Sequence, residues 1–170
     1  MRAKLSPLVA RLRELEATDR RAMAVLRRSL AFDPGTWPPA YVYVERFVGG
    51  ENISPRYRNA SYLTAGLFAM HTEHCDGISM GEALRRLAQK RPHSKSIEDR
   101  FLSLLAADDD LLLNRLRQAL SLLRAEGIGL DYNRLLQDLT WWKTDNNRVQ
   151  RNWARDYYRR EQVTTAEQDA

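Results

Sequence analysis

Helix start and stop signals follow one another along almost the whole chain. This series of signals limits the possible folds more than any other feature of the sequence. Ser, Thr or Asp repeatedly precede amphipathic stretches, and such side chains accept hydrogen bonds from the free N–H groups of a first helical turn. Proline stands at the start of three stretches, at Pro7, at Pro38 with Pro39, and at Pro55, while Gly49, Pro92 and Gly127 end others. The predicted helices are 7–16, 19–31, 37–48, 54–74, 79–91, 96–105, 108–126, 131–142 and 144–162.

Strand-like patterning is almost absent. The Val-Tyr-Val at 42–44 is the one β-like patch, and it is too short to outweigh its helical surroundings. With 44% apolar residues, the chain can form a core. We therefore expect an all-α fold of about nine helices in two small packed helical bundles. The expected units are an N-terminal bundle at 1–92, a C-terminal bundle at 93–163 and a frayed tail at 164–170, with one compact unit as the alternative.

The cysteine count and the short length of the apolar runs indicate in which cellular compartment the protein resides. Cys75 is the single cysteine, so an internal disulfide is excluded, which suits a reducing cytoplasm. The first residues are interrupted by Pro7, Arg11 and Arg13 and lack the apolar stretch of a signal peptide. No apolar run approaches the length of a membrane span. We expect a soluble, cytoplasmic protein without a membrane partner.

The last predicted helix gives the sharpest functional signal. At about 100° per residue, Arg148, Arg151, Arg155 and Arg159 fall within an arc of about 80°, opposite an apolar face. That apolar face consists of Val149, Trp153 and Tyr157. Like charges on one helix face repel each other, and a bound phosphate backbone would offset the repulsion. The alternative is an exposed face paired with carboxylates of neighbouring helices.

A second basic group stands near the N-terminus. Arg20 and Arg27, and likewise Arg21 and Arg28, are seven residues apart, so each pair repeats on one side of a helix. The net charge of +5 is concentrated at the two ends of the chain, since residues 1–30 hold eight basic residues against three acids. Such clusters favour a polyanionic partner. A solvated surface with more arginine than average is the alternative.

The residue types that could perform chemistry do not form a recognisable site. His71, His74, Cys75 and His93 are the candidate metal ligands, but they lack the paired spacing of a zinc site. No glycine-rich phosphate loop or nucleophile elbow is present. We expect no enzymatic activity, no cofactor and no metal. Trp141 and Trp142 could stack on bases, but the helical periodicity turns one of them into the core.

Several sequence segments, in order, carry a family resemblance. They are WPPAYVYVERF, AGLFAMH, RFLSLLAA, LRQALSLLRAEGIGLDYNRLLQDLTWW and RVQRNWARDYY. Together they cover roughly residues 18–160, and they resemble the small-subunit (CasB-type) family of the type I-E CRISPR Cascade complex. The resemblance implies two small helix bundles, no enzymatic activity and two copies of the subunit in a crRNA-guided surveillance complex.

The resemblance also implies sequence-independent nucleic-acid binding through basic patches. It assigns this role to Arg27 and Arg28, and to Lys143, Arg148, Arg151, Arg155 and Arg159. The expected function is therefore to stabilise the displaced strand of the R-loop and the crRNA–target duplex in antiviral defence, with crRNA, target DNA and other Cascade subunits as partners. Two alternatives remain: a structural adaptor whose arginines bind acidic partner surfaces, and, less favoured, a metal-dependent enzyme using the His/Cys group.

Overall fold

Helices dominate the computed structural model, which describes residues 5–144 and 146–160. Within these residues there are nine α-helices, one short 3-10 helix and no strand, as the all-α prediction requires. They are α1 (Pro7–Thr18), α2 (Arg20–Ser29), η1 (Pro38–Ala40), α3 (Tyr41–Val48), α4 (Pro55–Met70), α5 (Met80–Lys90), α6 (Lys95–Leu105), α7 (Asp109–Ala125), α8 (Tyr132–Thr140) and α9 (Arg148–Tyr157). The Val-Tyr-Val patch lies inside α3.

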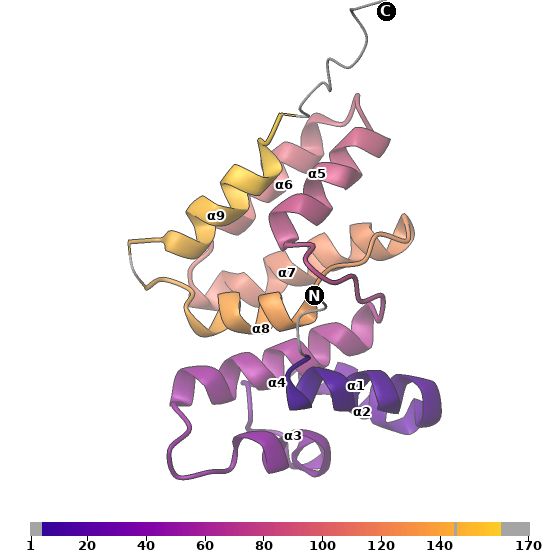
Figure 1. Ribbon diagram of the computed structural model, residues 1–170, viewed down its shortest axis with the longest axis vertical. Helices are drawn as coiled ribbons and strands as arrows, with labels where there is room; N and C mark the ends of the chain where they lie inside the picture. The colour runs from indigo at the N-terminus through magenta and orange to yellow at the C-terminus, as the bar shows by residue number, and fades with distance from the viewer. Residues whose placement is uncertain (1–4, 145, 161–170) are drawn as a thin grey trace, which may run out of the picture.

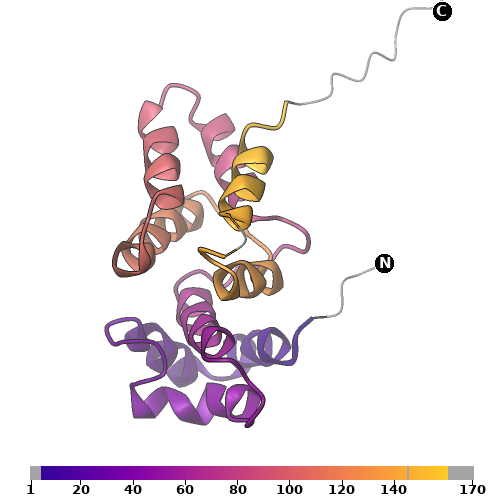
Figure 2. The ribbon, with the colours of Figure 1, turned by 90° about the vertical axis from the view of Figure 1, so that its left-hand side faces the viewer.

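The helices form two groups, which Figures 1 and 2 show one above the other. Helices α1 to α4 make the lower group, and α5 to α9 make the upper one, with α4 packed against α8 where the groups meet. This confirms two small packed bundles. The division into units at residues 92 and 93 stays a prediction, and the packing of α5 against α9 favours a boundary between α4 and α5 instead.

Capping side chains begin most of the helices at the predicted places. Each accepts a hydrogen bond from the first helical turn at 2.9 to 3.2 Å. These residues are Asp19, Ser54, Ser79, Asp108 and Asp131. Five short-range sequence signals therefore fix the starts of five helices, because each side chain satisfies an N–H group that the helix itself leaves free.

Three predicted helix starts are wrong. The helix predicted from residue 37 begins as the 3-10 helix η1 at Pro38, and α3 itself begins only at Tyr41. Helix α6 begins at Lys95 after Ser94, and Ser96 lies inside the helix with its hydroxyl 2.8 Å from the hydroxyl of Ser94. Helix α9 begins only at Arg148, because Asn146 and Asn147 have positive φ angles of 53° and 57° that no α-helix contains. The other expected cap of the last helix, Asp145, lies outside the described residues, as does the tail at 164–170.

The predicted end of the fourth helix is also wrong. Helix α4 ends at Met70 rather than near residue 74, and the following segment 71–79 pairs with the loop after α7. The N–H of Cys75 donates to the carbonyl of Leu130 at 3.0 Å, and the N–H of Asp131 donates to the carbonyl of Ile78 at 2.7 Å. Backbone hydrogen bonds therefore join the segment that connects α4 to α5 with the loop that connects α7 to α8.

The bundle contact is apolar and aromatic. The ring of Phe68 on α4 meets the ring of Tyr132 on α8 edge-on at 5.0 Å, and both residues are fully buried. The Tyr132 hydroxyl donates to the carbonyl of His71, so the one polar group of this contact is satisfied. No helix in the described ranges is both long and apolar enough to cross a bilayer.

Candidate nucleic-acid interface

Helix α9 presents the two faces that its periodicity predicts. Val149 and Trp153 are buried on the side of α9 that packs against α5, whereas Arg148, Arg151 and Arg155 are exposed. We call these three exposed arginines the α9 basic surface. Tyr157, the third residue of the predicted apolar face, is half-buried and stacks on Phe101 with ring centroids 4.2 Å apart. The aromatic side chains thus fix the rotation of the helix, so that Arg151 and Arg155 lie on its exposed side.

Arg159 does not belong to that helix face. Helix α9 ends at Tyr157, so the prediction of a helix to residue 162 is wrong, and Arg159 follows the helix. Its guanidinium lies 3.1 Å from a carboxylate oxygen of Asp156. Asp156 is buried and also accepts from the Ser79 hydroxyl at 2.6 Å and from Arg134 at 3.0 Å. Three donors surround this carboxylate, so Arg159 is partly neutralised.

A close backbone approach positions α9 on α5. A Cβ atom added to Gly81 of α5 would lie 2.1 Å from the carbonyl oxygen of Trp153. The absence of a side chain at Gly81 therefore lets the two helix backbones touch. Glycine at this position is a packing requirement, because no larger residue fits without moving α9.

A half-buried carboxylate lies beneath the α9 basic surface. Asp138 of α8 accepts a hydrogen bond from the indole Nε1 of Trp153 at 2.7 Å. Burial raises the pKa of Asp138 from 3.8 to about 6, against the lowering effects of the Trp153 hydrogen bond and of the Arg134 and Arg148 charges. Arg148 is therefore electrostatically linked to a group beneath its own helix.

The loop between α8 and α9 carries Lys143 and the tryptophan pair. Lys143 has a positive φ of 65°, and its ammonium lies 3.5 Å from a carboxylate oxygen of Asp109. Trp142 is buried against Trp153, whereas Trp141 is 47% exposed. This confirms that only one of the two tryptophans faces the core. Lys143 is already paired with an acid of α7, which weakens its attraction for phosphate.

The second predicted basic group forms an exposed face of α2. Arg20, Arg21, Arg27 and Arg28 are all exposed, and we call them the α2 basic surface. Within residues 5–144 and 146–160, no carboxylate forms an ion pair with any of these four. The guanidinium of Arg28 instead lies 5.8 Å from the ring centroid of Trp37. These charges are available to a polyanion.

One arginine that the sequence did not single out joins this surface. Arg124, at the end of α7, lines a groove of about 520 Å³ together with Arg20 and Arg27. Glu16 and Glu73 also line the groove. In the sequence, Arg124 looks like an ordinary basic residue that complements the negative end of a helix dipole. Only the packing of α7 beside the N-terminal bundle brings it to the α2 arginines.

The two basic surfaces lie apart. Figure 1 shows α9 in the upper bundle on the left and α2 in the lower bundle on the right. Figure 2, turned by 90°, again shows the two helices in different bundles. The structure therefore does not merge the two predicted clusters into one patch. A nucleic acid would meet this protein at two separate places.

The candidate metal ligands have other partners. The imidazole Nε2 of His71 lies 2.6 Å from the carbonyl of Ile128, and His74 contacts both Asp76, at 2.8 Å, and the N–H of Tyr132, at 3.2 Å. His93 is exposed on the turn before α6. In the part of the chain that the structure describes, no three metal-ligating side chains gather. The two histidines act as hydrogen-bonding links between the segment 71–79 and residues 128–132.

The chain is similar to proteins of one family. A family model described as CRISPR-associated protein Cse2 matches residues 22–158. A CRISPR-associated protein Cse2 of Thermus thermophilus is 46% identical over 138 residues, which cover 81% of this chain and 78% of that protein. The crystal structure of a Cse2-family protein of Thermus thermophilus has a TM-score of 0.78 at 41% identity, covering 91% of this chain and 99% of the other.

A further similar structure comes from an assembly. One chain in the crystal structure of E. coli Cascade bound to a PAM-containing double-stranded DNA target has a TM-score of 0.65 at 26% identity. The match covers 88% of this chain and 91% of that chain. Both the helical fold and its extent are therefore shared with a chain of that complex.

Proposed function

Because the chain belongs to the CRISPR-associated Cse2 family, we propose that it is a non-catalytic subunit of a crRNA-guided Cascade surveillance complex. The similarity to a chain of E. coli Cascade bound to double-stranded DNA supports this assignment. In such a complex, base pairing reads the target sequence, while the protein subunits hold backbones and the displaced strand. A subunit with this task needs exposed positive charge and no reactive site.

The observation that carries the proposal is the charge of the α2 basic surface, which no carboxylate of the described residues neutralises. Guanidinium groups bind phosphate bidentately, and each contact releases condensed counterions whatever the base sequence. The α9 basic surface offers a second set of three exposed guanidinium groups. We therefore propose sequence-independent binding of nucleic-acid backbone at both surfaces.

Two separate surfaces suit two separate strands. One surface would contact the displaced DNA strand and the other the crRNA–target duplex, so that together they stabilise the R-loop in antiviral defence. The assembly would contain other Cascade subunits and a second copy of this chain. Co-purification with a tagged neighbouring subunit tests the assembly directly: we expect two copies of the chain to arrive with a short RNA. Recovery of the chain without partner subunits or RNA would contradict it.

Charge-neutralising variants test the binding surfaces. Arg27→Gln with Arg28→Gln should weaken binding of single-stranded DNA by about tenfold or more, because each lost phosphate contact removes favourable counterion release. A control pair of equal charge change is Arg100→Gln with Arg117→Gln, two exposed arginines of α6 and α7. The control should bind like the wild type. Equal losses in both pairs would show that only net charge matters and would contradict a defined surface.

A structural adaptor is the second candidate function, and the pairing of Lys143 with Asp109 favours it for that part of the molecule. The same contact chemistry would let basic side chains bind acidic surfaces of partner subunits. In this case a Lys143→Gln variant would bind DNA normally but fail to join the complex. The combined assays therefore separate the two functions.

A further inference from the structure

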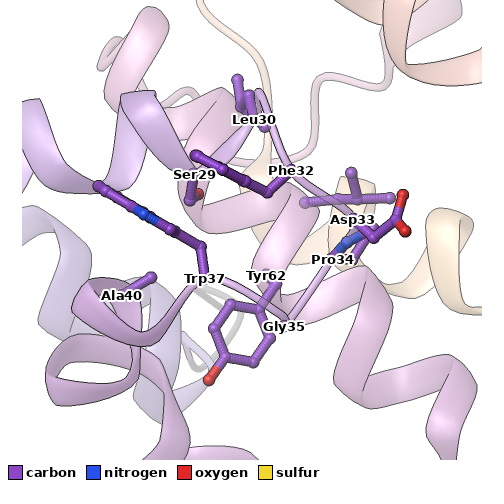
Figure 3. A pocket seen from close by; sticks show the side chains of 10 residues that line it. Ser29, Leu30, Phe32, Asp33, Pro34, Gly35, Trp37, Ala40 and Tyr62 are labelled. Atoms are coloured by element: carbon purple, nitrogen blue, oxygen red, sulfur yellow. The ribbon is translucent and has the colours of Figure 1, made fainter.

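A stacked aromatic pair follows directly after the α2 basic surface. The rings of Phe32 and Trp37 are parallel within 3°, with centroids 5.3 Å apart, and Figure 3 shows both rings edge-on. Trp37 also contacts the guanidinium of Arg28. The pair therefore joins an arginine that can bind phosphate to a flat apolar surface.

The ring of Phe32 is held in place by its neighbours but remains partly exposed to solvent. Its ring packs against Trp37, yet 43% of the residue is exposed. The backbone that carries it is fixed by a turn in which Gly35 has a positive φ of 72°, and in which Arg58 and Tyr41 donate to the Gly35 carbonyl at 3.3 and 3.1 Å. An immobilised, exposed aromatic ring loses little conformational entropy when a ligand stacks on it.

The open side of Phe32 borders a groove between the two bundles. This groove has a volume of about 650 Å³, which is within the size range of small-molecule sites. Its charged lining residues are Asp33, Asp109, Asp110, Arg56 and Lys143. Acids outnumber bases here, so the groove suits an uncharged group better than a phosphate. A strand whose phosphates lie on α2 would keep its charge outside this groove.

We propose that Phe32 stacks an unpaired nucleobase of the strand whose phosphates the α2 basic surface binds. Every base has a π-face, so this contact adds affinity without reading sequence. The inference rests on the proposed function, since it requires a strand on α2. It adds a distinction that arginines alone cannot make: a single strand with accessible bases binds more tightly than a strand of the same charge without bases.

The test compares two strands and three variants. The strands are oligo(dT) of about 20 nucleotides and an abasic strand of the same length and charge, both longer than the site of one small binding module. We expect Phe32→Leu to lower the affinity for oligo(dT) about tenfold and to leave abasic binding unchanged. Phe32→Tyr keeps the ring and should bind like the wild type. Leu102→Ala, which shortens a side chain that is 47% exposed on α6, is the control for losing exposed apolar surface.

Each other outcome has a distinct meaning. Unchanged oligo(dT) affinity in Phe32→Leu overturns the stacking proposal while leaving the arginine surfaces intact. An equal loss on both strands also overturns it, because the ring would then act through the fold. Normal DNA binding combined with failed co-purification would make Phe32 a protein contact. Failure of the proposed function looks different: the Arg27→Gln and Arg28→Gln variant would bind both strands like the wild type.

Discussion

Replacing Asp138 by Asn tests whether the carboxylate beneath α9 is a cost to the fold. The carboxylate accepts the indole hydrogen bond of Trp153 at 2.7 Å, and the amide oxygen of Asn can accept the same bond. Burial raises the pKa of Asp138 from its ordinary 3.8 to about 6. The substitution therefore keeps the geometry and removes only the titratable charge.

The sign of the effect follows from the direction of the pKa shift. The folded protein holds this proton more tightly than the unfolded chain, so the associated stability is complete below pH 3.8 and is lost as the pH rises through about 6. A shift of about two pKa units corresponds to about 3 kcal/mol at about 1.4 kcal/mol per unit. The ionised Asp138 thus destabilises the folded protein at neutral pH, although Arg134 and Arg148 offset part of the burial.

We expect Asp138→Asn to raise the free energy of unfolding at pH 7.5 by about 3 kcal/mol, and to leave it nearly unchanged near pH 4. Urea unfolding at both pH values measures this difference. Asp99→Asn, on the exposed side of α6, is the matched control and should shift neither value. A variant that is less stable than the wild type at pH 7.5 would refute the reasoning, because the charge of Asp138 would then be a net attraction to the arginines.

Two further substitutions test the packing that carries α9, and a third serves as their control. Gly81→Ala should lower the free energy of unfolding by about 3 kcal/mol and weaken DNA binding, since the new Cβ would collide with the Trp153 backbone; calorimetry and a binding titration measure both. Ser79→Ala should cost about 2 kcal/mol in urea unfolding, because it removes the cap of α5 and the hydrogen bond to Asp156. Gly50→Ala, which would meet only the Ile53 side chain at 3.6 Å, should leave the thermal midpoint unchanged, and a fall like that of Gly81→Ala would refute the packing argument.

Local sequence signals predicted most helices, because a capping side chain contacts a backbone N–H only about three residues further along the chain. Asp19, Ser54 and Ser79 all cap where the pattern places them. The outward arginines of α9 were predictable for a similar reason, since a buried Trp153 fixes the rotation of a regular helix. What depends on one helix or on one turn can be read from the sequence.

The remaining features depend on contacts between distant segments. Arg124 reaches the α2 arginines only through the packing of α7, and Arg159 leaves the helix face because α9 ends two residues earlier, at Tyr157. The stack of Phe32 on Trp37 likewise requires the turn between them. No periodicity encodes these arrangements, because each is set by tertiary packing.

The salt dependence of single-strand binding tests the central claim, that exposed arginines bind nucleic-acid backbone. With about four phosphate contacts, the log–log slope of affinity against salt should be near −3. Arg27→Gln with Arg28→Gln should reduce its magnitude by about 1.4, that is, about 0.7 for each lost contact. A slope identical to the wild type would contradict the account and leave these arginines to protein partners.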